Sequence, residues 1–77
     1  MQNLKAGKII GANIRRIRKS QHLTQDALAA KLQVKDLDIS RSTLAKIESG
    51  IRHIALDELK IIKDVLKAEY NDFFDGA

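Results

Sequence analysis

Hydrophobic side chains recur along the first part of the chain at the spacing of an α-helix. Ile10, Ile14 and Ile17 are three or four residues apart, so they lie on one side of a helix, and Gln21 continues the series. This pattern predicts a first helix over residues 8–21. Its outer side carries three basic residues, Arg15, Arg16 and Lys19.

A second, shorter helix is predicted over residues 25–32. The hydroxyl of Thr24 can accept a hydrogen bond from an unpaired backbone amide at the start of this helix, and Asp26 suits the positive end of the helix dipole. Leu28 and Leu32 then point inward.

The third predicted helix begins after the capping residue Ser40 and ends at Gly50, because glycine readily adopts the left-handed conformation that follows a helix. On a helical projection its inner side carries three apolar residues, Leu44, Ile47 and Ile51. Its outer side carries small, polar and basic residues, Ser42, Ala45, Lys46 and Ser49, with Arg41 at the leading edge. This outer side is either an ordinary solvated surface or a surface that recognises a ligand.

Two further helices are predicted in the last third of the chain. Four residues at helical spacing indicate a helix over residues 56–67: Leu56, Leu59, Ile62 and Leu66. Ala55, before it, is a poor capping residue because it has no side-chain oxygen. Phe73 and Phe74 then predict one closing turn of helix that covers the core.

The composition places these helices in one small domain. The chain has 77 residues, of which 44% are hydrophobic and 31% are charged, and it has no proline. These values favour an all-α fold, a compact bundle of about five short helices, over a disordered or fibrous chain. We expect a single domain over residues 1–77.

Several classes of site have no support in the sequence. Cysteine is absent, and no apolar run approaches the ~18 residues of a membrane span. We therefore expect no disulfide, no metal site, no cofactor, no small-molecule ligand and no membrane segment, and a cytoplasmic location.

The net charge of +4 is unevenly distributed. Residues 1–52 contain 11 Lys and Arg against 4 Asp and Glu, a net charge of +7, whereas residues 53–77 contain 3 against 6, a net charge of −3. The first part therefore suits a polyanion such as nucleic acid. A basic surface alone does not distinguish a nucleic-acid site from a solvated surface.

Three segments together resemble the phage repressor and Cro-like (XRE-type) helix-turn-helix family. They are IRRIRKSQHLTQDALAAKL, VKDLDISRSTLAKIESGIR and LDELKIIKDVLKAEYNDFF, and they place the core of the domain at residues 9–74. The most specific parts are LTQ followed by LA, and SRSTLAKIESG. The resemblance implies a lambda-repressor-like fold and sequence-specific binding of double-stranded DNA by a prokaryotic or phage transcriptional regulator, in the first instance a repressor.

In that family the second and third helices form the helix-turn-helix, and the third lies in the major groove. By position, the resemblance implies base contacts from Arg41, Ser42 and Lys46. It implies contacts to backbone phosphates from Gln25, Ser49 and Arg52. For Gln25 and Arg52, a plain solvated surface stays open as the alternative.

The resemblance also implies an ion pair inside the fold. The family position that matches Glu48 pairs with an arginine of the first helix, and Arg18 stands at that place, beside the stripe of Ile14 and Ile17. We expect Arg18 and Glu48 to fix the third helix against the first.

Two regions of the sequence depart from the family pattern. The segment between the second and third helices, residues 33–39, is longer than the pattern requires, which leaves the docking angle on DNA open. We expect a loop that is held by one or two of its apolar side chains, Val34, Leu37 and Ile39. Asp36 and Asp38 would be repelled by phosphate, so this loop should either tilt away from DNA or offer it only Lys35. Ile54 stands where the family often has proline, and Lys67 replaces a common glycine, so the turns on either side of the fourth helix are open as well.

Catalysis has little support. His22 and His53 are isolated from any carboxylate or nucleophile at a spacing that would build a site, so we expect no enzyme. A partner-binding role, as in an antitoxin or adaptor of the same family, stays open as the alternative function.

A homodimer is expected because of the small number of base pairs that one helix can read. One short helix reads too few base pairs to find an operator in a genome, so two copies on an inverted repeat are needed. The expected interface is the segment around His53 and Ile54 with residues 70–74, although Phe73 and Phe74 are assigned to the core rather than to the interface.

Overall fold

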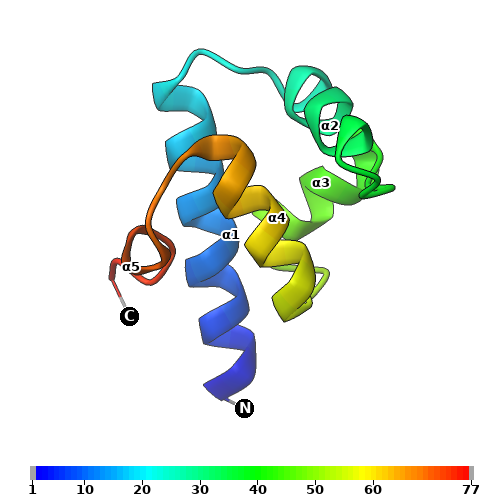
Figure 1. The fold of residues 1–77 in the computed structure, drawn as a ribbon. Helices are drawn as coiled ribbons and strands as arrows, with labels where there is room; N and C mark the ends of the chain where they lie inside the picture. Colours follow the sequence, from blue (N-terminus) through cyan, green and yellow to red (C-terminus); the bar gives the residue numbers. More distant parts are fainter. Residues whose placement is uncertain (1, 77) are drawn as a thin grey trace.

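Residues 2–76 fold into five helices, with α1 running through the middle of the molecule (Figure 1). The computed structural model describes residues 2–76, with side chains from residue 6 onward. The helices are α1 (Gln2–Ser20), α2 (Gln25–Val34), α3 (Arg41–Glu48), α4 (Leu56–Leu66) and α5 (Tyr70–Phe73). Residues 2–76 contain no strand, so the predicted all-α class is confirmed. None of the described helices combines the length and apolar character that crossing a membrane requires.

The core lies where the inner sides of the helices meet. It contains apolar side chains from every helix and from the α2–α3 connection: Ile14, Ile17, Leu28, Leu32, Ile39, Leu44, Ile47, Leu59, Ile62, Leu66 and Phe73. Removing these side chains from water is the main favourable contribution to folding. The helical spacing in the sequence identified nearly all of them.

Three apolar residues that the pattern assigned to the interior lie at the surface instead. The exposed fraction is 77% for Ile51, 77% for Leu56 and 45% for Phe74. Because α3 ends at Glu48, helical spacing no longer applies at Ile51. Leu56 is the first residue of α4 and Phe74 follows the last residue of α5, so neither belongs to a continuous helical stripe over the core.

The predicted bounds of the first helix were wrong at its start. α1 begins at Gln2 rather than at Lys8, because residues 2–7 contain no proline and continue the helix, whereas the apolar spacing begins only at Ile10. The helix ends at Ser20, and Gln21 lies in the following turn.

The connection between α2 and α3 is shorter than predicted. α2 continues to Val34, so only residues 35–40 join the two helices. Ile39 is 1% exposed and Leu37 packs partly buried against the core, which confirms that two apolar side chains hold the connection. Val34, by contrast, is 81% exposed.

Four helices are followed by a residue in the left-handed conformation. After α3 this residue is Gly50, with φ of 83°, where the absence of a side chain removes the steric penalty. After α1, α2 and α4 it is His22 (61°), Asp36 (62°) and Lys67 (55°). The turn after α4 therefore keeps the conformation that glycine would favour, at a steric cost of about 1–2 kcal/mol.

α3 rests directly on the backbone of α1 because Gly11 has no side chain. A Cβ atom at Gly11 would clash with the carbonyl oxygen of Ile47 and would lie 2.9 Å from that of Glu48. This close approach fixes the C-terminal end of α3 against α1.

Asn13 anchors the C-terminal end of the chain to α1. Its buried side-chain amide donates hydrogen bonds to the carbonyl oxygens of Phe73 (3.0 Å) and Asp75 (2.9 Å). Arg16 donates to the side-chain oxygen of Asn13 (3.1 Å) and to the carbonyl oxygen of Asp72 (3.1 Å). These contacts hold α5 so that Phe73 closes the core.

Candidate nucleic-acid interface

Capping side chains orient the first turns of α2 and α3. The backbone amide of Ala27 donates to Oγ1 of Thr24 (3.0 Å), and that of Thr43 donates to Oγ of Ser40 (3.2 Å). Both predicted caps are confirmed. The other amides of each first turn have no partner within the helix, so an anion at the helix start can accept hydrogen bonds from them.

α3 is two-sided, as the sequence predicted. Its inner side is closed to water, since Leu44 is 0% exposed and Ile47 is 1% exposed. Its outer side presents four exposed polar or basic side chains, Arg41, Ser42, Lys46 and Ser49. The structure therefore brings the predicted base-contact residues together on one accessible surface, while their contact with DNA stays a prediction.

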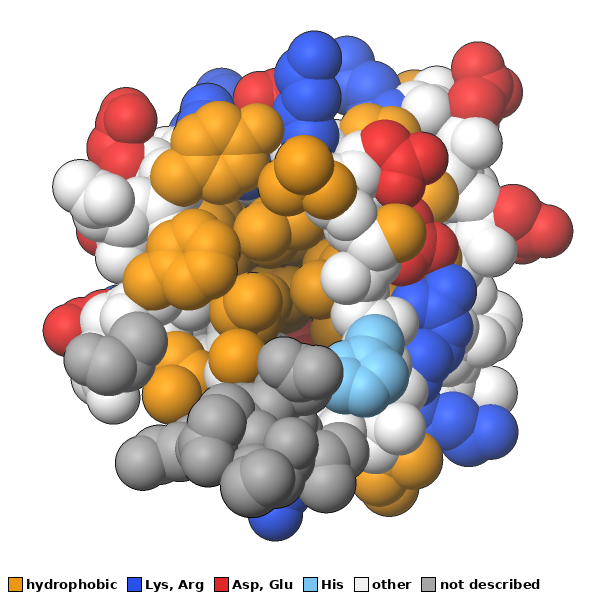
Figure 2. Space-filling view, turned by 90° about the horizontal axis from the view of Figure 1, so that it is seen from below, with side chains coloured by type: hydrophobic (Ala, Val, Ile, Leu, Met, Phe, Trp, Pro, Cys, Tyr) orange, Lys and Arg blue, Asp and Glu red, His pale blue; other side chains and the backbone are white. Residues whose placement is uncertain are grey.

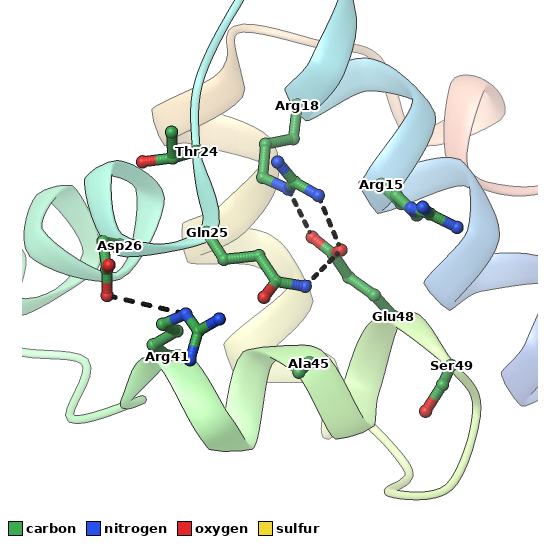
Figure 3. A pocket seen from close by; sticks show the side chains of 9 residues that line it. All are labelled: Arg15, Arg18, Thr24, Gln25, Asp26, Arg41, Ala45, Glu48 and Ser49. Atoms are coloured by element: carbon green, nitrogen blue, oxygen red, sulfur yellow. Dashed lines mark hydrogen bonds and ion pairs between the residues drawn. The ribbon is translucent and has the colours of Figure 1, made fainter.

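The contact expected between Arg18 and Glu48 is present and buried (Figure 3). Nε and Nη2 of Arg18 donate to the two carboxylate oxygens of Glu48 at 2.7 and 3.0 Å. The side chains are 8% and 2% exposed. A third nitrogen of Arg18 donates to the carbonyl oxygen of Leu23 (2.7 Å), so this arginine joins α1, the start of α2 and the end of α3.

The side chain of Gln25 forms a hydrogen bond with the carboxylate of the same ion pair. Its side-chain Nε2 donates to Oε1 of Glu48 at 3.0 Å, which turns the amide toward the interior of the site (Figure 3). The sequence assigned Gln25 only a contact to DNA phosphate. In the structure it also cross-links α2 to α3, a role that spacing alone did not reveal.

A hollow of about 650 Å³ opens between α1, α2 and α3. Nine residues line it: Arg15, Arg18, Thr24, Gln25, Asp26, Arg41, Ala45, Glu48 and Ser49 (Figure 3). Because Arg18 and Glu48 neutralise each other, the charged groups that remain are two arginines and one aspartate. The hollow is therefore positively charged and suited to an anion.

Arg15 is the lining residue that the sequence interpretation missed. It lies on α1, exposed, on the side of the hollow opposite Arg41 (Figure 3). The sequence placed Arg15 only on the outer side of its helix. The available signal was its position three residues before Arg18, because residues at that spacing are neighbours on a helix surface.

Arg41 has a loose contact with an acid across the hollow. Its Nε lies 3.9 Å from Oδ1 of Asp26, and the two side chains are 65% and 77% exposed. Exposed pairs of this kind contribute about 0–1 kcal/mol and are readily exchanged for another partner. The guanidinium of Arg41 is therefore available to a ligand.

Ser49 and Arg52, the other two predicted phosphate contacts, follow α3. Oγ of Ser49 donates to the carbonyl oxygen of Lys46 (3.1 Å). Arg52 pairs with Glu58 of α4 at 2.9 Å, and its side chain remains 38% exposed. The hydrogen bond from Arg52 lowers the pKa of Glu58, while the same bond raises the pKa of Arg52. Arg52 thus has a structural partner in addition to its predicted role.

Glu58 also compensates for the poor cap of α4. Its Oε1 accepts a hydrogen bond from the backbone amide of Ala55 at 2.9 Å. This satisfies an amide at the start of α4 although Ala55 has no side-chain oxygen. Arg52 and Glu58 together therefore fix the connection that leads out of α3.

Comparison with known proteins identifies the arrangement of α2 and α3. The family described as Helix-turn-helix (HTH_3) matches residues 14–73, which covers most of the chain and all the elements that build the interface. No curated protein and no solved structure gives a significant match. The chain belongs to the HTH_3 family of XRE/Cro/C1-type helix-turn-helix proteins, and this membership implies that it binds DNA.

Proposed function

We propose that the protein is a transcriptional regulator, acting as a repressor, that binds double-stranded DNA in a sequence-specific manner. α3 lies in the major groove, with its first turn toward the base edges. The observation that supports this proposal is the outer side of α3, where exposed hydrogen-bonding groups stand on a helix that a buried ion pair holds in place.

The base-contacting residues in this proposal are Arg41, Ser42 and Lys46. Arg41 can donate two parallel hydrogen bonds to O6 and N7 of guanine, and Lys46 prefers the same acceptors. Ser42 both donates and accepts, so it discriminates less between bases. We therefore propose a target that contains guanine near the position of the helix start.

The phosphate contacts in this proposal surround the hollow and the end of α3. Gln25 contributes its backbone amide and the remaining hydrogen of its side-chain amide, since the other hydrogen is bound to Glu48. Arg15 faces the same hollow from α1, and we add it to the set. Ser49 and Arg52 extend the set beyond α3, although Glu58 neutralises part of the charge of Arg52.

The protein acts as a homodimer on an inverted repeat in this proposal. A single α3 reads about three to five base pairs, and each correctly read pair contributes roughly 1–3 kcal/mol of discrimination. This is too little to select one operator among ~10⁶ competing sites. Two copies related by a two-fold axis would place their α3 helices about 34 Å apart, one turn of DNA.

Selection of bound sequences from a random pool of duplex DNA tests this function. We expect enrichment of an inverted repeat, and an affinity for it that falls steeply with salt because Lys and Arg displace counterions from phosphate. Recovery of no preferred sequence, with affinity insensitive to salt, would contradict the proposal and would favour a role in binding a partner protein.

A further inference from the structure

The C-terminal ends of α2 and α4 form a hollow that is separate from the one assigned to phosphate. Its volume is about 370 Å³, and it is lined by Lys31, Val34, Lys35, Asp64, Val65 and Lys67. None of these residues lines the hollow between α1, α2 and α3. We refer to these six residues as the α2–α4 hollow.

The α2–α4 hollow lies at the opposite end of α2 from the candidate DNA interface. Gln25, the first residue of α2, lines the phosphate hollow, whereas Val34, the last residue, lines the α2–α4 hollow. At 1.5 Å per residue, these two residues are about 13 Å apart along the helix axis. A molecule bound in the α2–α4 hollow can therefore be separate from bound DNA.

The positive charge of the α2–α4 hollow is not neutralised within the fold. Three lysines stand against one aspartate, a net charge of +2. Asp64 is paired with a fourth lysine, Lys63, at 3.6 Å. Lys31, Lys35 and Lys67 form no ion pair with any of residues 6–76. The negative ends of the two helix dipoles offset only about one unit of charge, so an excess of positive charge remains.

Two valines add apolar surface to the α2–α4 hollow. Val34 is 81% exposed, and Val65 packs partly buried against the core. The hydrocarbon chains of lysine also offer apolar contact area while their ammonium groups stay in water. The face that is seen from below in Figure 1 differs, because hydrophobic side chains gather at its centre and Lys and Arg lie toward its margin (Figure 2). The α2–α4 hollow therefore combines apolar contact with positive charge in one place.

Lys67 occupies its position at a conformational cost. Its φ of 55° lies in the left-handed region, where glycine is favoured because a side chain is strained there. The side chain of Lys67 nevertheless lines the α2–α4 hollow and forms no ion pair with the described residues. A strained residue that adds no such contact to the fold is consistent with a role in binding.

We propose that the α2–α4 hollow binds an acidic segment of a protein partner, in which an aliphatic side chain lies between carboxylates. The carboxylates pair with the lysines, and the aliphatic side chain packs against Val34 and Val65. The phosphates of a nucleic acid would satisfy the lysines but leave both valines uncovered. A protein segment therefore uses more of this surface than DNA does. The inference does not depend on the proposed function.

Selection from a library of displayed random peptides tests this assignment. The full chain is the target, and a variant that combines Lys31→Ala, Lys35→Ala and Lys67→Gly serves for counter-selection, which removes peptides bound at other surfaces. We expect the remaining peptides to be enriched in Asp and Glu on both sides of Leu, Ile or Val. The proposal is overturned if no peptide distinguishes the parent from the variant, or if the remaining peptides lack acidic residues.

Fluorescence anisotropy of one selected peptide then measures the contribution of each group. Lys35→Glu should raise the dissociation constant at least tenfold through charge repulsion, and Val34→Ser about fivefold through lost apolar contact. Arg15→Ala is the matched control, because it removes an exposed positive charge outside the α2–α4 hollow, and it should leave the dissociation constant unchanged. Equal weakening by Arg15→Ala and Lys35→Glu would mean that net charge, and not this hollow, determines binding.

Lys67→Gly separates a role in binding from a role in the fold. Glycine adopts the left-handed conformation without strain, so the melting temperature should rise, while peptide affinity should fall about fivefold because a positive charge is lost. A structural role predicts the reverse. A lower melting temperature with the peptide affinity of the parent would contradict the proposed contact.

Binding of duplex DNA distinguishes the other possible occupant of the α2–α4 hollow. Lys35→Ala should bind duplex DNA with the affinity and salt dependence of the parent, and the selected peptide and the duplex should bind at the same time. Competition between them, together with a smaller salt dependence in Lys35→Ala, would make the hollow a contact to the DNA backbone and overturn the proposal. If the chain binds the peptide and no DNA, the proposed function fails and this inference stands.

Discussion

Two arginine–carboxylate pairs beside α3 contain the same chemical groups in opposite environments. Arg18 and Glu48 are 2.7 Å apart and almost fully buried, whereas Arg41 and Asp26 are 3.9 Å apart and mostly exposed. Removing one member of a buried pair strands the remaining charge away from water, whereas an exposed charge is simply hydrated. The inner pair therefore holds α3 in place, and the outer pair leaves an arginine available for contact.

A third pair lies between these two extremes. Arg52 and Glu58 are 2.9 Å apart, with side chains 38% and 16% exposed. This pair fixes the connection after α3, yet its arginine still reaches water. Across the three pairs, the more deeply the side chains are buried, the more the pair contributes to holding α3 in place and the less accessible its arginine is to DNA.

Replacement of Glu48 should have the largest effect on stability. Glu48→Ala leaves Arg18 without its carboxylate and Gln25 without an acceptor, so we expect the free energy of unfolding to fall by about 3–5 kcal/mol. Urea denaturation measures this difference. Asp26→Ala is the control from the exposed pair and should cost less than about 1 kcal/mol. Equal costs for the two variants would remove the distinction between the pairs.

The contact between α1 and α3 can be weakened without a change of charge. Gly11→Ala introduces a Cβ atom against the carbonyl oxygens of Ile47 and Glu48, so α3 must shift away from α1. We expect a loss of about 1–3 kcal/mol in the free energy of unfolding. Ala12→Gly, at an exposed position of the same helix, should cost about 1 kcal/mol through helix propensity alone. If Gly11→Ala were neutral, the close approach would not determine the position of α3.

Removal of the exposed acid should strengthen DNA binding. Asp26 lies in the hollow that we assign to phosphate, and a like charge about 4 Å away costs roughly 1 kcal/mol in water. Asp26→Asn should therefore raise affinity for duplex DNA about fivefold at low salt, with little change in sequence preference. Fluorescence anisotropy at two salt concentrations measures both quantities. Unchanged affinity would place phosphate away from this hollow.

The intermediate pair should produce a small dependence of stability on pH. The pKa of Glu58 is lower in the folded chain than in the unfolded chain because Arg52 donates to its carboxylate. The stabilisation is therefore present above the unfolded pKa, about 4.3, and is lost as the pH falls through the folded value. The difference in melting temperature between the parent and Glu58→Gln should shrink on acidification from about pH 6 to pH 3. A difference that is independent of pH would exclude this origin.

The sequence was sufficient to predict the features that follow from helical spacing, from side-chain chemistry at helix starts, or from positions that match the family pattern. Helical spacing identified the five helices and nearly all of the core, because the buried side of a helix repeats at a fixed interval. The capping roles of Thr24 and Ser40 followed from side-chain chemistry. Arg18 and Glu48 are 30 positions apart in the sequence, and only the family resemblance predicted the contact between them.

The sequence could not predict what depends on tertiary contact. Gln25 bonds to Glu48 only because α2 and α3 meet there. The partner of Arg52 depends likewise on how α4 packs after α3. Leu56 is exposed because the first residue of α4 does not lie over the core. The spacing of apolar residues does not show which end of a helix extends beyond the core.

The central claim is that the exposed side of α3 reads bases while its buried side holds the fold. The most direct test compares the sequences that the parent and Arg41→Ala select from the same random pool of duplex DNA. We predict that Arg41→Ala loses the preference at one base pair of each half-site, at a cost of about 1–3 kcal/mol, and unfolds at the temperature of the parent. Lys31→Ala, which removes an exposed charge at the other end of α2, should keep the preference. An unaltered sequence preference in Arg41→Ala, with parental affinity, would contradict the claim.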